Sequence, residues 1–436
     1  MTGWAKTWVF LVVGIAYHAA GRVQAADLTA PGDADPPQTP LSAEAFTAAV
    51  LEQNASLEAM RQAVVAAVQQ IKPAGALEDP MLSLSAAPRT FGSATGPSGD
   101  VEVSQALPWW GTLDARTEVA RAEAEAASHD FDALRLRLAV LARGAFADWV
   151  FVHRALEINA ANLSVLGELR SVARVRYTTG QAPQEDILQA DVERAQLRQQ
   201  KIEWERKRTV VQARMNALLD VAPRTEVALP VDLPTAVSLP AEEVLEQRAL
   251  GHPELEQLEA RVRAAQAREQ LEEKKRYPQF SLSTGYNNMW SDPAMRPMVG
   301  VSVSIPLNQG KYRAAIAAAH AQARRSASTL EDQQASVRAD LASAYASVLE
   351  AAQSLALYRD ELVPLARNTL EVARTEYGSG RGDFLNVLTA EQHRLDTELG
   401  LARMQSEYYR DIAELERASG GGLLAPRSPD SSSSVP

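Results

Sequence analysis

The chain repeats its own plan at a spacing of about 200 residues, and this internal repeat limits the available folds more than any other feature. The stretch that begins Asp79-Pro80 aligns with the stretch that begins Tyr277-Pro278, at an offset of 198. Further along, the segment YTTG at 177–180 aligns with YGSG at 377–380, at an offset of 200. Residues 41–240 are therefore expected to form a first structural repeat, and residues 241–419 a second.

Two stretches in each repeat alternate apolar and small polar residues, which is the period of a β-strand. Leu82 and Leu84 alternate with serines in the first repeat, and residues 299–305 show the same pattern in the second. Hairpins are expected at about 79–108 and about 277–307. One apolar and one polar face suit the wall of a transmembrane barrel, although an ordinary hairpin of a soluble domain has the same pattern.

The stretches between the hairpins are predicted to be helical, because Ala, Glu, Gln, Arg and Leu dominate and Gly and Pro are rare. Their apolar residues recur at steps of three and four, which indicates coiled-coil packing. The longest helix should measure on the order of 100 Å at 1.5 Å per residue, and two shorter helices placed end to end would match it. The expected helices are Ser42 to Ile71, Trp109 to about Val175, Pro183 to Asp220, Glu242 to Arg276, Lys311 to Thr375 and Asp383 to Ala418.

The two ends of the chain differ in composition from the repeats. Residues 1–25 combine an apolar run with a small-residue ending and are expected to be a cleavable secretory signal. Residues 26–40 form a Pro-rich linker, and residues 420–436 a flexible tail rich in Gly and Ser. The absence of cysteine excludes disulfides and thiolate metal sites. The formal net charge of −11 argues against nucleic acid as a partner.

Four strands are too few to close a barrel, since single-chain barrels in membranes need at least about eight. Open strand edges are not tolerated in the hydrocarbon core of a bilayer, so several copies must pool their strands. The expected fold class is therefore mainly α with a transmembrane β part. In it, long coiled-coil helices form a tunnel that continues from a shared barrel.

The chain resembles the TolC-like outer-membrane efflux proteins from about Leu41 to about Ser419. The resemblance rests on the doubled plan, on QALPWWG at 105–111, on IPLNQG at 305–310 and on both Tyr-x-x-Gly turns. It implies a homotrimer with a twelve-stranded barrel in the outer membrane and an α-helical tunnel in the periplasm. It also implies contact with outer-membrane lipid and docking to a periplasmic adaptor (membrane fusion) protein and an inner-membrane pump.

Each Tyr-x-x-Gly segment lies where a long helix reverses direction. A glycine suits the left-handed position that ends a helix, so a helix cap followed by a turn accounts for both glycines. The resemblance places these reversals at the periplasmic tip of the tunnel, where the adaptor docks. The residues expected at this partner contact are Tyr177, Gly180, Tyr377, Gly380 and Arg381.

The resemblance also indicates where a gate belongs. In the best-known family member, rings of Asp constrict the tunnel after the second turn, but the matching positions here are Asn386 and Thr389. Glu185, Asp186 and Asp383 supply negative charge nearby, although acidic residues also favour the first turn of a helix. These five residues are the gate candidates.

The function expected from these features is that of an outer-membrane channel subunit in a tripartite efflux pump. Asp79-Pro80 and the segment at 107–111 resemble the heavy-metal or cation branch of the family most, and a type I secretion or drug-efflux duct is the alternative. A periplasmic coiled-coil adaptor or scaffold is the alternative from another class. The sequence has no cofactor fingerprint, metal-ligand spacing or paired nucleophile and base, so no cofactor, metal site or enzymatic activity is expected.

Overall fold

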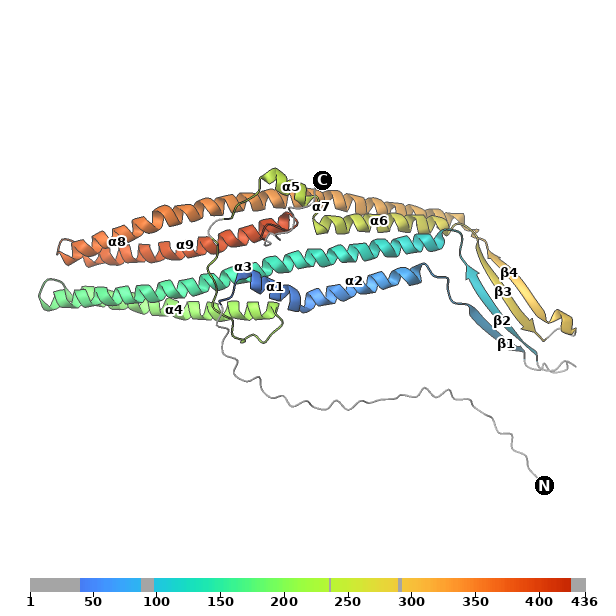
Figure 1. Cartoon of the computed structure of the whole chain (residues 1–436), viewed down its shortest axis with the longest axis horizontal. Helices are drawn as coiled ribbons and strands as arrows, with labels where there is room; N and C mark the ends of the chain where they lie inside the picture. Colours follow the sequence, from blue (N-terminus) through green and yellow to red (C-terminus); the bar gives the residue numbers. More distant parts are fainter. Residues whose placement is uncertain (1–39, 88–97, 235–236, 289–291, 425–436) are drawn as a thin grey trace, which may run out of the picture. The chain divides into compact units, whose positions relative to one another are not determined.

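The computed structural model describes residues 40–87, 98–234, 237–288 and 292–424. The expected signal at 1–25, nearly all of the linker at 26–40 and most of the tail at 420–436 lie outside these residues. The described chain is mainly helical with one small antiparallel sheet, as the sequence predicts (Figure 1). The helices are α1 (Ala43–Gln53), α2 (Ala55–Ala74), α3 (Thr112–Thr178), α4 (Gln184–Leu218), α5 (Glu242–Ala249), α6 (Pro253–Lys274), α7 (Gln309–Leu357), α8 (Val363–Gly378) and α9 (Phe384–Ala418). The strands are β1 (Met81–Ala87), β2 (Ser98–Leu107), β3 (Gln279–Asn287) and β4 (Pro297–Ser304).

The four strands form a single sheet in the order β1-β2-β3-β4, and each neighbouring pair is antiparallel. Leu82 lies opposite Val103, Val103 opposite Thr284, and Thr284 opposite Val299. Since side chains alternate between faces, this mainly apolar row shares one face of the sheet. The adjacent row on the other face consists of Ser83, Glu102, Gly285 and Met298. Strands β1 and β4 form the two edges.

Helix α3 has 67 residues and follows directly from strand β2. Helix α6 packs beside its N-terminal part, where Arg263 pairs with Glu125 at 2.7 Å. Helix α4 packs beside its C-terminal part, where Arg170 pairs with Asp191 at 2.6 Å (Figure 1). Two shorter helices therefore lie along one long helix. Among the described residues, no helix is both long enough and apolar enough to span a bilayer.

Three helices that the sequence predicts as continuous are broken in the structure. The helix expected from Glu242 to Arg276 is split into α5 and α6, because Pro253 begins α6 and cannot continue a helix from α5. His252 caps α6, with its Nδ1 accepting from the Glu254 amide at 3.2 Å. The helix expected from Ser42 to Ile71 is split at Asn54, whose side chain accepts from the Ser56 amide and starts α2.

The helix expected from Lys311 to Thr375 is interrupted by a π-helical turn over Tyr358–Leu362. Pro364 follows this turn, and it can neither donate a backbone hydrogen bond nor accommodate an α-helical carbonyl at Asp360. The helix instead widens by one residue at this turn, so that the Val363 amide donates to the Tyr358 carbonyl five residues earlier. The expectation of an unbroken helix was therefore wrong at this point.

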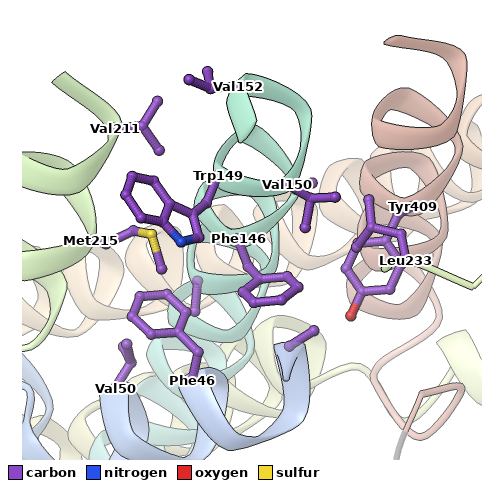
Figure 2. Packing of buried hydrophobic residues seen from close by; sticks show 13 residues of the cluster. Phe46, Val50, Phe146, Trp149, Val150, Val152, Val211, Met215, Leu233 and Tyr409 are labelled. Atoms are coloured by element: carbon purple, nitrogen blue, oxygen red, sulfur yellow. The ribbon is translucent and has the colours of Figure 1, made fainter. Parts of the chain in front are cut away.

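A large hydrophobic cluster forms where α1, α3, α4 and α9 meet (Figure 2). Phe46 of α1, Phe146 and Trp149 of α3, Met215 of α4 and Tyr409 of α9 are all buried in it. The Trp149 indole N–H donates to the Ala228 carbonyl at 3.0 Å, so the ring is held without an unpaired polar atom. This cluster joins elements from both ends of the sequence.

Replacing Phe146 by alanine tests the contribution of this cluster. Phe146 is almost completely buried, so F146A removes a full aromatic side chain and leaves a cavity. We expect a loss of about 3–5 kcal/mol in the free energy of unfolding, measured by urea denaturation in detergent. The control is L141A on the same helix, because Leu141 is exposed. Equal losses in the two variants would contradict the assignment of this core.

Candidate functional site

The candidate site is the helical tip, defined here as the turns at 178–184 and 378–384 with the helix ends beside them. Helix α3 ends at Thr178, and the Gln181 amide then donates back to the Arg176 carbonyl at 2.8 Å. Helix α8 ends in the same way, with the Arg381 amide donating to the Glu376 carbonyl at 2.9 Å.

Both turns need a glycine at the same point. Gly180 has a φ of 71° and Gly380 a φ of 77°, and this left-handed conformation is costly for residues with a Cβ. The two glycines therefore close helix ends of one type. Their backbone geometry is the same in both halves of the chain.

The two tyrosines of these turns have different environments. Tyr177 is 45% exposed, whereas Tyr377 is 3% exposed. The Tyr377 hydroxyl donates to the Asp186 carboxylate at 2.7 Å, which connects the end of α8 with the start of α4. The ring of Tyr377 also packs against Phe384, at 5.1 Å between ring centroids. Tyr377 is therefore a buried contact between the two helical hairpins.

Arg176 completes this contact from the first turn. Its guanidinium lies 4.5 Å from the centroid of the Tyr377 ring, a cation–π arrangement. A side chain at Gly380 would meet the same guanidinium at 3.4 Å, so Arg176 reaches as far as the second turn. One of its nitrogens donates to the Gln181 carbonyl at 3.3 Å, while Nε and Nη1 are buried and have no hydrogen-bond partner among the described residues. We call Arg176, Asp186, Tyr377 and Phe384 the tip cluster.

The chemistry of the tip cluster favours a neutral tyrosine. Burial raises the pKa of Tyr377 above its ordinary value, and the hydrogen bond to Asp186 raises it further, while Arg176 opposes the shift. Asp186 is itself only 8% exposed, and the Tyr377 hydroxyl satisfies one of its oxygens. Loss of that hydroxyl would leave a buried carboxylate short of a donor.

The structure brings only some of the predicted site residues together. Asp186, Tyr377 and Gly380 lie within the cluster or against it. The remaining residues are exposed on the surface of the tip: Tyr177, Gly180, Glu185, Arg381, Asp383, Asn386 and Thr389. Glu185 accepts a hydrogen bond from Gln189 of its own helix, and Thr389 donates to the Leu385 carbonyl.

Sequence reasoning missed Arg176. The residue that corresponds to it in the second repeat is Glu376, so the repeat carries no sign of a special arginine at this position. Its position beside Tyr177 was the one available signal, but the ring that it covers belongs to Tyr377. The contact depends on tertiary structure and has no local pattern.

A second polar network lies further along the same helices. Arg394 of α9 pairs with Glu391 and with Glu398, and it also hydrogen-bonds to Asn162 of α3. Arg367 of α8 pairs with the same Glu398 at 2.9 Å. The network thus links α3, α8 and α9 behind the tip. In the part of the chain that the structure describes, no three His, Asp or Glu side chains are grouped as metal ligands.

Comparisons with known proteins agree with this architecture. The family model described as "Outer membrane efflux protein" matches residues 48–220 and 244–421. Nodulation protein T of Rhizobium leguminosarum bv. viciae is 23% identical over 451 residues, covering 89% of this chain and 84% of that protein. The channel CusC superposes with a TM-score of 0.77 at 19% identity, over 87% of this chain and 92% of that chain. The outer membrane protein VceC of Vibrio cholerae superposes with a TM-score of 0.75 at 18% identity, over 87% of this chain and 96% of that chain.

The fold is therefore that of the outer-membrane channel proteins. The chain belongs to the outer membrane efflux protein family, since the family model covers most of its length. This membership confirms the resemblance to TolC-like proteins, and it places the protein in the outer membrane with its helices extending into the periplasm.

Conservative changes at the two tyrosines test the tip cluster. Y377F removes the donor to a buried carboxylate, which should weaken the local structure by about 1–3 kcal/mol. We expect faster hydrogen exchange in amides of residues 370–390, read by mass spectrometry. Y177F is the matched control, because Tyr177 is exposed and should leave exchange unchanged. If the amides of Y377F exchanged at the wild-type rate, the tip cluster would have no structural role.

Proposed function

We propose that the chain is the outer-membrane channel subunit of a tripartite efflux pump and acts as a passive duct. Three copies would pool their four strands into one barrel, and their helices would form the tunnel below it. An adaptor protein in the periplasm and a pump in the inner membrane would deliver the solute. The observation that carries this proposal is the sheet. Its apolar face and its two edges have no partner among the residues that the structure describes.

The apolar face of the sheet is strongly exposed. Val299 is 80% exposed, and Leu82, Leu84 and Val301 are also exposed. A continuous apolar surface of this kind is unfavourable in water but suits contact with lipid. The opposite face carries mainly serine and glycine, with Asp100 and Glu102 as its acidic residues, which suits a water-filled interior.

The edges of the sheet support an assembly of copies. Strand β1 pairs only with β2, and strand β4 only with β3, among the strands that the structure describes. Each edge presents unpaired backbone groups, which have no solvent to bond with inside a bilayer. Pairing of β1 with β4 of the next copy would satisfy both edges and close a ring.

The tip suits partner docking and gating. Tyr177, Gly180, Gly380 and Arg381 form an exposed surface at the turns, and we assign the adaptor contact to them. Tyr377 is buried in the tip cluster, so it would support this surface from the interior and would not contact the adaptor directly. That cluster connects the two helical hairpins of one chain, so we propose that its contacts hold the aperture closed. Glu185, Asp383, Asn386 and Thr389 remain gate candidates on the exposed face.

The cargo stays a prediction. The preference for heavy-metal or other cation efflux rests on Asp79-Pro80 and on the segment at 107–111. The acidic residues on the polar face of the sheet are compatible with cations. A drug-efflux or type I secretion duct would have the same sheet and tip. Selection among solutes would belong mainly to the pump.

Membrane fractionation tests the proposed duct against a periplasmic scaffold. We expect the protein in the outer-membrane fraction and a trimeric mass in detergent. The chain has no cysteine, so cysteines placed at Ser83 on β1 and Ser302 on β4 should allow a bifunctional maleimide to link three copies. The single-cysteine variants are the controls and should give at most dimers. A soluble periplasmic monomer would contradict the proposal and favour the scaffold.

Conductance in planar bilayers tests the gate. Wild-type trimers should rest mainly closed, and Y377F should raise the open fraction about fivefold or more, the effect of losing one buried hydrogen bond. D186N should act in the same direction, and the double variant should add little because both changes remove one contact. Y177F is expected to conduct like the wild type. A closed Y377F channel would show that another contact holds the aperture.

A further inference from the structure

A cavity of about 580 Å³ lies where the sheet meets the helices. Its wall is mostly apolar and comes from the end of β2, from β3 and β4, and from the start of α3. Leu107, Leu282 and Val301 line it from the sheet, and Trp109 and Trp110 from the connection between β2 and α3. Leu282 and Val301 lie opposite each other in adjacent strands, so the cavity is continuous with the apolar side of the sheet.

The two tryptophans form a fixed aromatic group. Trp109 stacks on Tyr277, with ring centroids 4.9 Å apart and planes 8° apart. Trp110 meets the edge of Trp109 at 4.8 Å and is 73% exposed. Neither indole N–H forms a hydrogen bond with the residues that the structure describes. Such rings combine an apolar body with a free donor, which suits the boundary between hydrocarbon and headgroups.

A cation lies at the rim of this cavity. Gly111 lines the cavity, and a side chain at this position would meet the Lys274 ammonium at 3.4 Å. Within the described chain Lys274 forms no ion pair, whereas the next residue, Lys275, pairs with Glu272. The first turn of α3 lies beside it and has no side-chain cap, so its free amides add positive potential. Asp114, in the first turn of α3, is the one carboxylate among the lining residues.

We propose that this cavity binds an anionic phospholipid of the periplasmic leaflet. An acyl chain would lie along the leucines and tryptophans, and the headgroup phosphate would lie against Lys274 and the start of α3. The inference rests on the proposed function, which puts the apolar face of the sheet in contact with lipid. The choice of an anionic lipid rests on the unpaired ammonium, because a chain with a net charge of −11 would otherwise repel negative headgroups.

The position of the cavity favours lipid over a second copy of the chain. Copies would join through β1 and β4, but the wall centres on the inner strands β2 and β3 and on the connection to α3. A lipid held there would fix the depth at which the barrel sits in the bilayer. It would also cover the exposed part of Trp110, whose inner side packs against Trp109 and Phe280.

Native mass spectrometry of the purified trimer tests the site. Phosphatidylglycerol and phosphatidylethanolamine with the same acyl chains are titrated separately, and we expect the wild type to prefer phosphatidylglycerol. K274Q should lower the affinity for phosphatidylglycerol about fivefold, the effect of one lysine near an anionic headgroup, and should lower that for phosphatidylethanolamine less, because its own ammonium partly neutralises the phosphate. K275Q is the matched control, because Lys275 is already paired. W110A should weaken the binding of both lipids.

The outcomes separate this site from the proposed function. A wild-type trimer that inserts into membranes without preferring phosphatidylglycerol, or equal effects of K274Q and K275Q, would overturn the lipid site alone. A protein that does not insert would overturn the proposed function as well. A cysteine placed at Trp110 that crosslinks to a second copy would show that protein, and not lipid, covers the cavity.

Discussion

The close packing of other helices along α3 is the interaction on which the described structure depends. Helices α1, α2, α4, α6 and α9 all contact α3, which runs without interruption from the sheet to the tip. Small side chains make this possible, since alanines such as Ala142, Ala147 and Ala155 are fully buried along it. Their size lets neighbouring backbones approach closely, while Phe146 and Trp149 supply the apolar area at the central cluster. One helix thus sets the distance between the sheet and the tip.

Polar contacts then determine how the hairpins are joined at each level of α3. Arg143 pairs with the buried Glu416 near the central cluster, Asn162 accepts from Arg394 further along, and Arg176 covers Tyr377 at the end. Each contact links α3 to a residue of the second half of the chain. Buried ion pairs contribute little net stability, but they penalise wrong partners and so help to specify which helices meet. Hydrophobic packing holds the helices together, and these contacts define their register.

The sequence could predict the elements because their signals are local. The alternation around Leu82 and Val299 has a period of two, which no helix reproduces, and the sheet follows from it. The break before Pro253 also had a local signal, the proline itself, but the high helix propensity of the residues on both sides favoured one continuous helix. The π-helical turn before Pro364 is harder to predict, because one proline fits either a helix start or a distorted helix. The pairing of Tyr377 with Asp186 was beyond reach, because both Tyr-x-x-Gly segments look alike and only distant residues decide which ring is buried.

The unequal tyrosines have a consequence for symmetry. Three chains with two turns each would place six similar helix reversals around one axis, and backbone geometry alone would make them nearly equivalent. In the proposed trimer, burial of Tyr377 and exposure of Tyr177 would reduce this sixfold pattern to a threefold one. A ligand that recognises the tyrosine ring would then find three sites and not six, whereas a ligand that recognises only the glycine turn would find all six. The proposed trimer would therefore offer two numbers of binding sites, three or six, at the same end of the tunnel.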